Sequence, residues 1–225
     1  MSSPADSAAA APASAAARRS LTELLTAYQS VNNVAGTDKN TTHSYAELYE
    51  ALFASRRDSA RAVLELGVYS GASVVVWAEY FASAAVVGAD ITLAHVRFGA
   101  DHPRIRLVKT DATVPAAIAD VAAAAAELGV PASAVYDVIL DDASHDPKHQ
   151  VASAELFVPS LAPGGLYVIE DIAEDNATFV RENLARIAAE HGLSFAWHDL
   201  RDKKRRYDDI VAVMERPAAA DAATA

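Results

Sequence analysis

The chain has 225 residues, a formal net charge of −11 and no cysteine. This length suits one domain with a full hydrophobic core. The negative charge argues against nucleic acid or an anionic membrane as the main partner. The lack of cysteine excludes disulfides, thiolate catalysis and zinc–thiolate sites, and it fits a reducing compartment, so we expect a cytoplasmic protein. No run of about 18 strongly apolar residues occurs, so no membrane span is expected.

The ends of the chain are rich in alanine and lack large side chains. Such segments cannot bury enough apolar surface to offset the entropy lost on ordering, so residues 1–19 and 218–225 are expected to be disordered tails. Apolar residues at helical spacing indicate an N-terminal helical segment within 20–60, and residues 61–217 are expected to form the main domain.

Helical and strand patterns alternate along the rest of the chain. Helical spacing of apolar residues falls at 21–31, 44–55, 71–83, 114–129, 148–161 and 177–192. Short apolar runs typical of strands fall at 62–66, 84–90, 104–110, 136–142, 165–171, 193–200 and 209–216. This order predicts an α/β fold with a Rossmann-like, doubly wound, seven-stranded sheet that is mostly parallel. The last two strands lack a helix between them and are expected to form an antiparallel hairpin at one edge.

A glycine-containing loop follows the first strand in the stretch "LELGVYSGAS". Gly67 and Gly71 allow a tight turn and a close approach to a ligand, and the next helix offers unpaired N–H groups. Tyr69 breaks the dinucleotide pattern G-x-G-x-x-G, which makes a pyrophosphate cradle a poorer interpretation.

Three acids in order strengthen the case for a different cofactor. Glu65 lies inside an apolar strand, where a carboxylate needs a positive or hydrogen-bonding partner. Asp90 ends the second strand, where an acid can accept both hydroxyls of a ribose, and Asp111 follows the third strand, within reach of an adenine amine. Each acid alone is equally explained as a strand end or helix cap. Together they predict S-adenosylmethionine, bound by Glu65, Gly67, Val68, Tyr69, Ser70, Gly71, Asp90, Asp111 and Asp141.

A second polar group follows strands four and five, in the stretches "DDASHD" at 141–146 and "ED" at 170–171. Adjacent parallel strands lie about 4.8 Å apart, so the two acidic ends can converge. Carboxylate oxygens with open positions suit Mg²⁺, and His145 titrates near neutrality, as a general base should. The alternative is that Asp141 or Asp142 caps the following helix and His145 is a solvated loop residue. The presence of two acidic pairs favours the metal site, with Asp141 and Asp146 in structural roles.

With both groups in view, the chain resembles the class I S-adenosylmethionine-dependent methyltransferases. It is most similar to the metal-dependent sugar O-methyltransferases of macrolide and tetracenomycin-type pathways, and to their hydroxylase-like relatives. The stretches that carry the likeness are "GTDK" (36–39), "HSYAELYE" (43–50), "LELGVYSGAS" (64–73), "WAEYF" (77–81), "VVGAD" (86–90), "YDVILDDASHD" (136–146) and "LAPGGLYVIEDI" (161–172).

The resemblance implies roles for individual residues. Position by position, it places Asp142, Glu170 and Asp171 on Mg²⁺ and makes His145 the general base. Other branches use an aspartate as base, which leaves Asp142 open in a double role as ligand and catalyst. The "GTDK…H" segment resembles a lid over cofactor and substrate, which makes Lys39 and His43 weaker candidates. Ala143 departs from the pattern, because the family commonly has glycine there, and this change is expected to shift the loop.

The leading hypothesis is therefore Mg²⁺-dependent methylation of a sugar hydroxyl on a small glycosylated natural product, by a homo-oligomer. Two alternatives stay open: a catechol-type phenol as the acceptor, and a non-catalytic accessory protein that retains the cofactor fold. The basic stretch "RDKKRR" (201–206) is either a means of steering an anionic substrate or the solvated tip of a hairpin.

Overall fold

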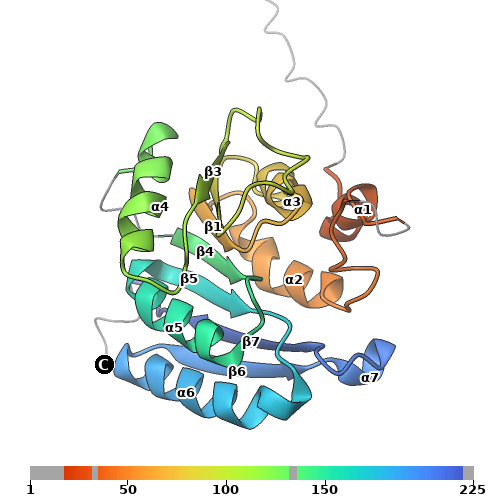
Figure 1. Ribbon diagram of the computed structural model, residues 1–225, viewed down its shortest axis with the longest axis vertical. Helices are drawn as coiled ribbons and strands as arrows, with labels where there is room; N and C mark the ends of the chain where they lie inside the picture. Colours follow the sequence, from red (N-terminus) through yellow and green to blue (C-terminus); the bar gives the residue numbers. More distant parts are fainter. Residues whose placement is uncertain (1–17, 32–34, 132–135, 220–225) are drawn as a thin grey trace, which may run out of the picture.

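A computed structural model describes residues 18–31, 35–131 and 136–219 of the chain. Its centre is a seven-stranded sheet in the order β3-β2-β1-β4-β5-β7-β6 (Figure 1). Strands β1 to β5 run parallel, and β7 pairs antiparallel with both β5 and β6. The predicted mostly parallel sheet with an antiparallel hairpin at one edge is therefore confirmed.

Each expected helix and strand is present, with shorter ends in most cases. The strands are β1 (Ala62–Leu66), β2 (Ala85–Asp90), β3 (Ile105–Lys109), β4 (Tyr136–Asp141), β5 (Leu161–Ile169), β6 (Ser194–Asp199) and β7 (Ile210–Glu215). The helices are α1 (Leu21–Ala27), α2 (Ala46–Phe53), α3 (Ala72–Tyr80), α4 (Ala116–Glu127), α5 (Pro147–Phe157), α6 (Ala177–Glu190) and α7 (Arg201–Lys204). Short 3₁₀ turns lie at Ala54–Arg56, Val158–Ser160 and Glu174–Asn176. The basic stretch expected as a plain turn thus contains one turn of helix.

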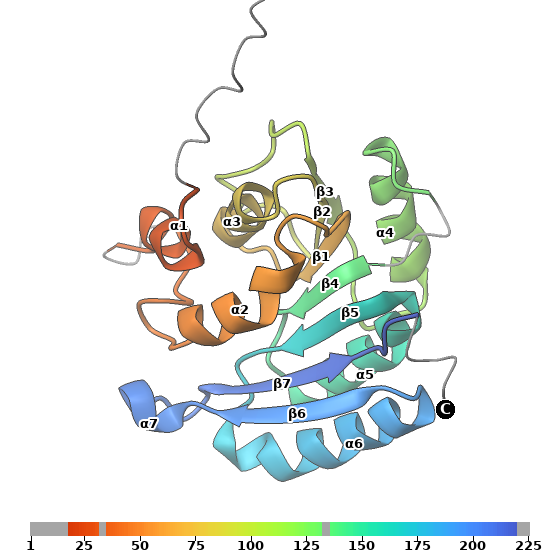
Figure 2. The same cartoon turned by 180° about the vertical axis from the view of Figure 1, so that it is seen from behind.

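Helices cover both faces of the sheet, which explains why its central strands are almost continuously apolar. Apolar side chains of α4, α5 and α6 form one buried cluster with one face of the sheet. Those of α1, α2 and α3 form the other, so the N-terminal segment shares the core of the main domain (Figure 2). Among the described residues, no helix is long and apolar enough to cross a membrane.

The order of the strands changes direction between β1 and β4, and ligands bind at such a point, outside the carboxyl ends of the strands. The backbone there is closely packed: the N–H of Asp142 donates to the carbonyl of Leu66 at 2.8 Å. Gly67 has φ +87°, and a Cβ on it would lie 2.0 Å from the carbonyl oxygen of Asp142. Glycine is therefore required where the loop after β1 passes the end of β4.

The predicted tails lie almost wholly outside the described residues. Of the predicted N-terminal tail, the structure describes Arg18, which contacts Asp58, and Arg19, which contacts Glu79. The division into tails, N-terminal segment and main domain stays a prediction.

Candidate functional site

A cavity of about 570 Å³ opens at the carboxyl edge of the sheet. Its walls come from the loops that follow β1, β2, β3 and β4, from Asp171 after β5, and from Ser30, Gly36 and Asp38 of the N-terminal segment. Both polar groups expected from the sequence therefore border one space. A volume of this size suits a small-molecule ligand.

The cofactor end of the cavity is built around Asp90 and Asp111. Asp90 accepts hydrogen bonds from the backbone N–H groups of Val68 at 2.8 Å and Tyr69 at 3.0 Å, and from that of Thr92 at 2.9 Å. Asp111 accepts from the hydroxyl and the N–H of Thr113, and these bonds lower the pKa of Asp111. Asp111 is thus held by its own loop, and Asp90 by its own loop and the loop after β1, at the rim of the cavity.

The residues predicted to bind the cofactor divide into two sets. Gly67, Tyr69, Asp90, Asp111 and Asp141 line the cavity. Val68, Ser70 and Gly71 are buried behind the loop and do not line the cavity.

Glu65 is fully buried and also stands apart from the cavity lining. Its Oε2 accepts a hydrogen bond of 2.9 Å from the Ser73 hydroxyl, and its Oε1 lies 3.9 Å from Lys39 Nζ. Burial raises the pKa of Glu65 to about 7. All the predicted cofactor contacts stay predictions, and for Glu65 the geometry indicates a contact with Lys39 instead.

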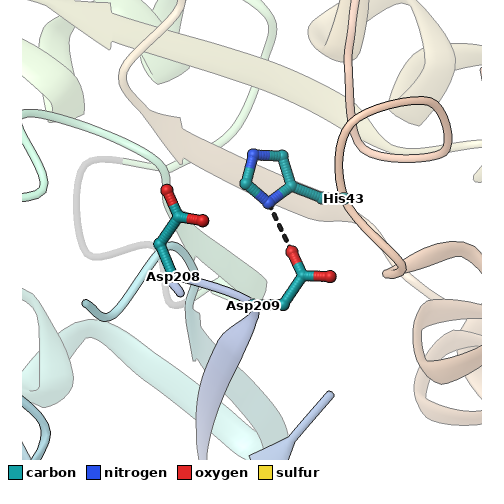
Figure 3. Close-up of side chains that lie close together, drawn as sticks. All are labelled: His43, Asp208 and Asp209. Atoms are coloured by element: carbon teal, nitrogen blue, oxygen red, sulfur yellow. Dashed lines mark hydrogen bonds and ion pairs between the residues drawn. The ribbon is translucent and has the colours of Figure 1, made fainter. Parts of the chain in front are cut away.

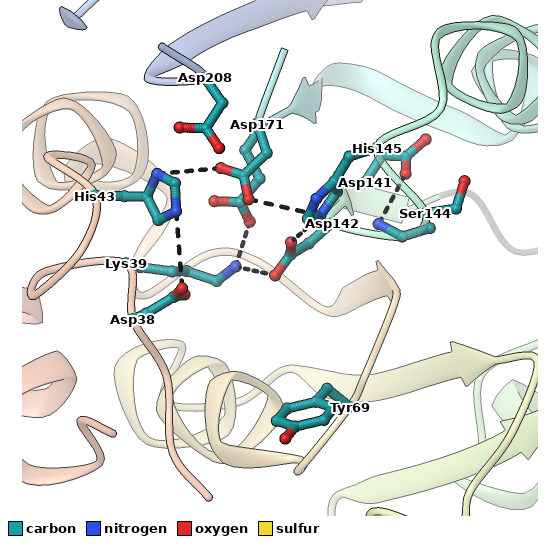
Figure 4. A network of polar contacts seen from close by, with 12 residues as sticks. Asp38, Lys39, His43, Tyr69, Asp141, Asp142, Ser144, His145, Asp171 and Asp208 are labelled. Carbon is teal, nitrogen blue, oxygen red and sulfur yellow. Dashed lines mark hydrogen bonds and ion pairs between the residues drawn. The ribbon is translucent and has the colours of Figure 1, made fainter. Parts of the chain in front are cut away.

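The chemical end holds four carboxylates, here called the acidic cluster: Glu65, Asp142, Glu170 and Asp171. The ammonium of Lys39 lies in its centre, 2.5 Å from Asp142 Oδ2 and in contact with Glu170 Oε1 (Figure 4). The Lys39 side chain is only 2% exposed. Because the partners are 103 and 131 positions away along the chain, these ion pairs form only in the folded protein.

Burial and charge act in opposite directions on this cluster. Burial alone would lower the pKa of Lys39, but Asp142, Glu170 and Glu65 raise it well above its usual range. Burial raises the pKa of Glu170 well above its ordinary value despite Lys39. For Asp142, the positive charges of Lys39 and His145 outweigh burial, so its pKa is lowered. Asp142 is therefore the carboxylate of this group most firmly held in its charged form.

Asp171 has different partners from Glu170, although the two are adjacent in sequence. Its Oδ1 accepts a hydrogen bond of 2.5 Å from Tyr45 and lies 3.3 Å from His43 Nδ1. Its Oδ2 lies 3.5 Å from His145 Nε2. Glu170 instead accepts from Tyr49 at 2.8 Å and does not line the cavity. The predicted metal ligands thus face two ways, with Asp142 and Asp171 at the cavity and Glu170 behind them.

His145 lies where the cluster meets the cavity. Its Nε2 is 3.2 Å from Asp142 Oδ1, and its side chain is 44% exposed. The hydrogen bond with Asp142 is the main cause that raises the pKa of His145 to about 9. Its φ of 56° is a left-handed conformation that residues other than glycine rarely adopt. His145 is thus an exposed loop residue, as the alternative expected, but its imidazole points at two carboxylates, so its role stays a prediction (Figure 4).

The helix-capping alternative applies to a different acid. Asp146 caps α5 by accepting from the N–H groups of Lys148 and His149. Asp141 accepts hydrogen bonds from Ser153 and Tyr167, and burial raises its pKa to about 6. Both acids have the structural contacts expected of them, although Asp141 also borders the cavity.

Sequence reasoning missed a second buried polar group, formed by His43, Asp208 and Asp209 (Figure 3). His43 Nδ1 lies 2.6 Å from Asp209 Oδ1, and Asp209 is fully buried at the start of β7. Because the same Nδ1 faces Asp171, this group positions a predicted metal ligand from behind. The resemblance made His43 a weaker candidate, but nothing local indicated Asp209 as a partner.

The basic stretch has a role that neither alternative described. Lys204 donates hydrogen bonds to the carbonyls of Asn40, Thr41 and His43. Lys203 pairs with Glu47 at 2.5 Å. These side chains fasten the N-terminal segment, with Lys39 and His43, onto the edge of the sheet.

The donor atoms suit a hard divalent cation. One oxygen each from Asp142 and Asp171 and one nitrogen of His145 lie within 4.8 Å of one another. Oxygens of Glu65, Asp142 and Glu170 satisfy the same condition. Carboxylate oxygens are the ligands that Mg²⁺ prefers, so Asp142 and Asp171 fit it directly, whereas Glu170 is engaged by Lys39 and Tyr49.

Comparison with known proteins identifies the kind of domain and the fold. Residues 64–172 match the family model described as a methyltransferase domain. Residues 64–172 are thus similar to a methyltransferase domain, and the chain has the fold of a solved methyltransferase. Such domains take their methyl group from S-adenosylmethionine, so the predicted resemblance is confirmed.

The chain is similar to two curated O-methyltransferases. It is 35% identical over 144 residues to 8-demethyl-8-alpha-L-rhamnosyl tetracenomycin-C 2'-O-methyltransferase of Streptomyces olivaceus, a match covering 61% of this chain and 35% of that protein. It is 30% identical over 138 residues to mycinamicin VI 2''-O-methyltransferase of Micromonospora griseorubida, covering 58% and 32%. The matched part thus spans about a third of the length of these relatives.

Among solved structures, the chain resembles MycE methyltransferase from the mycinamycin biosynthetic pathway, in complex with Mg, SAH and mycinamycin VI. The TM-score is 0.66 at 23% identity, over 90% of this chain and 56% of that one. This likeness shows that the fold is shared.

Proposed function

We propose that the protein transfers a methyl group from S-adenosylmethionine to a sugar hydroxyl of a small glycosylated natural product, with Mg²⁺. The observation that carries this proposal is the single cavity bordered by the glycine loop, Asp90 and Asp111 at one end and by Asp142, His145 and Asp171 at the other. The relatives that methylate sugars on tetracenomycin and mycinamicin support the choice of acceptor. We further propose that the protein acts in the cytoplasm, on the ground of its cysteine-free sequence.

The residues divide the work between them. The loop at 67–71 and the rim acids Asp90 and Asp111 would bind the cofactor with its methyl group facing the cavity. Asp142 and Asp171, with Glu170, would hold Mg²⁺, which supplies Lewis acidity to an acceptor hydroxyl. His145 is placed to remove the hydroxyl proton, and closure of the cavity by the N-terminal segment excludes water from the transfer.

The raised pKa of His145 has a consequence for the reaction. A general base must be neutral to accept a proton, and this imidazole, with a pKa of about 9, is mostly protonated at neutral pH. A cation bound to Asp142 and Asp171 would offset the charges that raise this pKa, so we expect the methyl-transfer rate to rise with pH through a pKa below that of the metal-free site.

The test is a transfer assay with methyl-labelled S-adenosylmethionine and a panel of deoxysugar glycosides and catechols, with Mg²⁺ or with a chelator. We expect label on a sugar hydroxyl, with Mg²⁺ only. Label on catechols alone would move the proposal to a phenol acceptor. Full activity with the chelator, or full activity of both His145→Ala and Asp142→Asn, would contradict the mechanism.

A further inference from the structure

Lys39 is a buried cation that the proposed reaction does not use. It comes from the "GTDK" stretch of the N-terminal segment, ahead of the matched methyltransferase domain. Its ammonium contacts one oxygen of Asp142 and one oxygen of Glu170, and it lies 3.9 Å from Glu65. Two of the three residues proposed to hold Mg²⁺ are therefore already bound to a positive charge supplied by the chain itself.

The geometry makes the two cations exclusive at these oxygens. An ion that used both Asp142 Oδ2 and Glu170 Oε1 would lie about 2.1 Å from each oxygen, as Mg²⁺ requires. Lys39 Nζ already lies between these oxygens, 2.5 Å from Asp142 Oδ2 and in contact with Glu170 Oε1. By contrast, the oxygens of Asp142 and Asp171 that face His145 make no contact with Lys39.

The rest of the segment does not depend on this lysine for its place. Lys204 holds the carbonyls of Asn40, Thr41 and His43, and the N–H of Tyr45 donates to the carbonyl of Lys39. The backbone of this segment is therefore anchored independently of the ammonium.

We propose that Lys39 is an internal competitor of the divalent cation for Asp142 and Glu170, and that this competition sets the metal affinity of the site. This inference rests on the proposed use of these residues as metal ligands. In the absence of the ion, Lys39 balances the charge of the acidic cluster and keeps it assembled. An ion that uses Asp142 Oδ2 and Glu170 Oε1 must displace the ammonium, and the free energy needed for this displacement reduces its affinity.

The test measures binding of Mn²⁺ alone, by electron paramagnetic resonance of the free ion, with no cofactor or acceptor present. Lys39→Met removes the competing charge at similar volume, and we expect it to lower the dissociation constant for Mn²⁺ by about tenfold or more. Lys39→Arg keeps the charge and should bind Mn²⁺ close to the wild-type affinity. Lys148→Met removes an exposed lysine on the neighbouring helix α5 and should leave the affinity unchanged.

A second measurement covers the stability of the variants, because Lys39→Met leaves buried carboxylates without their counter-charge. Its melting temperature should be lower than that of the wild type with a chelator and should rise more on addition of Mn²⁺. Lys39→Gln should behave in the same way. If Mn²⁺ stabilised neither variant, the competition would be contradicted.

The outcomes separate this inference from the proposed function. Equal or weaker Mn²⁺ binding by Lys39→Met would overturn the competition, while metal-dependent transfer by the wild type would leave the proposed function standing. Tighter Mn²⁺ binding without methyl transfer to any acceptor would support the competition and contradict the proposed function. No Mn²⁺ binding by any of the proteins would overturn both.

Discussion

The carboxylates at the two ends of the cavity have different kinds of hydrogen-bond partner. At the cofactor end, Asp90 and Asp111 are only partly buried and bind mainly backbone N–H groups, from the loop after β1 and from the loops that follow the acids themselves. In the acidic cluster, Glu170 and Asp171 are buried and bind side chains more than 120 positions away. The first arrangement needs only neighbouring strands of the sheet and the loops after them, whereas the second exists only when the N-terminal segment is docked on the sheet.

From this difference we predict that changes at the cofactor end mainly weaken cofactor binding, whereas changes beside the acidic cluster mainly lower the rate of methyl transfer. The largest expected effect is that of His145→Ala, which should lower kcat by about 10²- to 10⁴-fold, as loss of a general base does. His149→Ala is the matched control, because this imidazole lines the same cavity but contacts only Ser144 among the polar groups described. Transfer rates measured at saturating cofactor decide the point; equal rates for the two variants would contradict the role of His145.

The two ends meet at Gly67, and a change there should affect both. Gly67→Ala adds a Cβ that would lie 2.0 Å from the Asp142 carbonyl oxygen, in a left-handed conformation. We expect a loss of at least about 1–3 kcal/mol in the free energy of unfolding, together with weaker binding of S-adenosylhomocysteine. Gly129→Ala has a similar φ of +78° with nothing within 4 Å, so it reports the backbone strain alone. Denaturant unfolding would compare the free energies of unfolding of the two variants, and calorimetry their affinities for S-adenosylhomocysteine. Equal values would show that the end of β4 moves to accommodate the added Cβ.

A smaller effect is expected when only the cofactor end is disturbed. Asp90→Ala leaves three backbone N–H groups without their acceptor, which should cost about 1–3 kcal/mol of stability and weaken cofactor binding. Mn²⁺ binding should be unchanged, because Asp90 makes no contact with the acidic cluster. Asp101→Ala removes an exposed acid and serves as the control. If Asp90→Ala altered Mn²⁺ affinity, the two ends would not be independent.

The smallest effect concerns pH and the acidic cluster alone. The pKa of His145 is about 9 in the folded protein against 6.5 in an unfolded chain. Its pairing with Asp142 therefore stabilises the fold fully below pH 6.5, and this contribution is lost as the pH rises through 9. Because the side chain is 44% exposed, solvent screening keeps the effect small. Unfolding of the wild type and of His145→Gln, in chelator, should give stabilities that differ most below pH 6.5 and converge above 9; a constant difference would contradict this pairing.

The sequence predicted what depends on local pattern. The alternation of strands and helices gave the sheet, and strand ends on one rim brought Asp90, Asp111, Asp142, His145 and Asp171 to the same cavity. Distant pairing was not readable in this way. Nothing near residue 39 indicates that a lysine will be buried among carboxylates from β1, β4 and β5, or that Asp209 will contact His43.

The same limit explains why Glu65 was interpreted as a cofactor ligand. The sequence showed correctly that a carboxylate in an apolar strand needs a positive partner, but the cofactor was the only candidate in view. The structure provides another candidate within the chain, since Lys39 lies 3.9 Å away. Burial is a property of the assembled fold, so the choice between two partners requires the structure.

The position of Lys39 outside residues 64–172 bears on how related chains should be sorted. A comparison confined to the matched domain would group together all chains that have Asp142, Glu170 and Asp171, whatever residue stands at position 39. Natural chains with an uncharged residue at position 39 would lack the competing ammonium, as Lys39→Met does. We therefore expect them to retain metal through purification. Those with lysine should lose it. The cation requirement of each relative could then be anticipated from a single residue in the segment that precedes the domain.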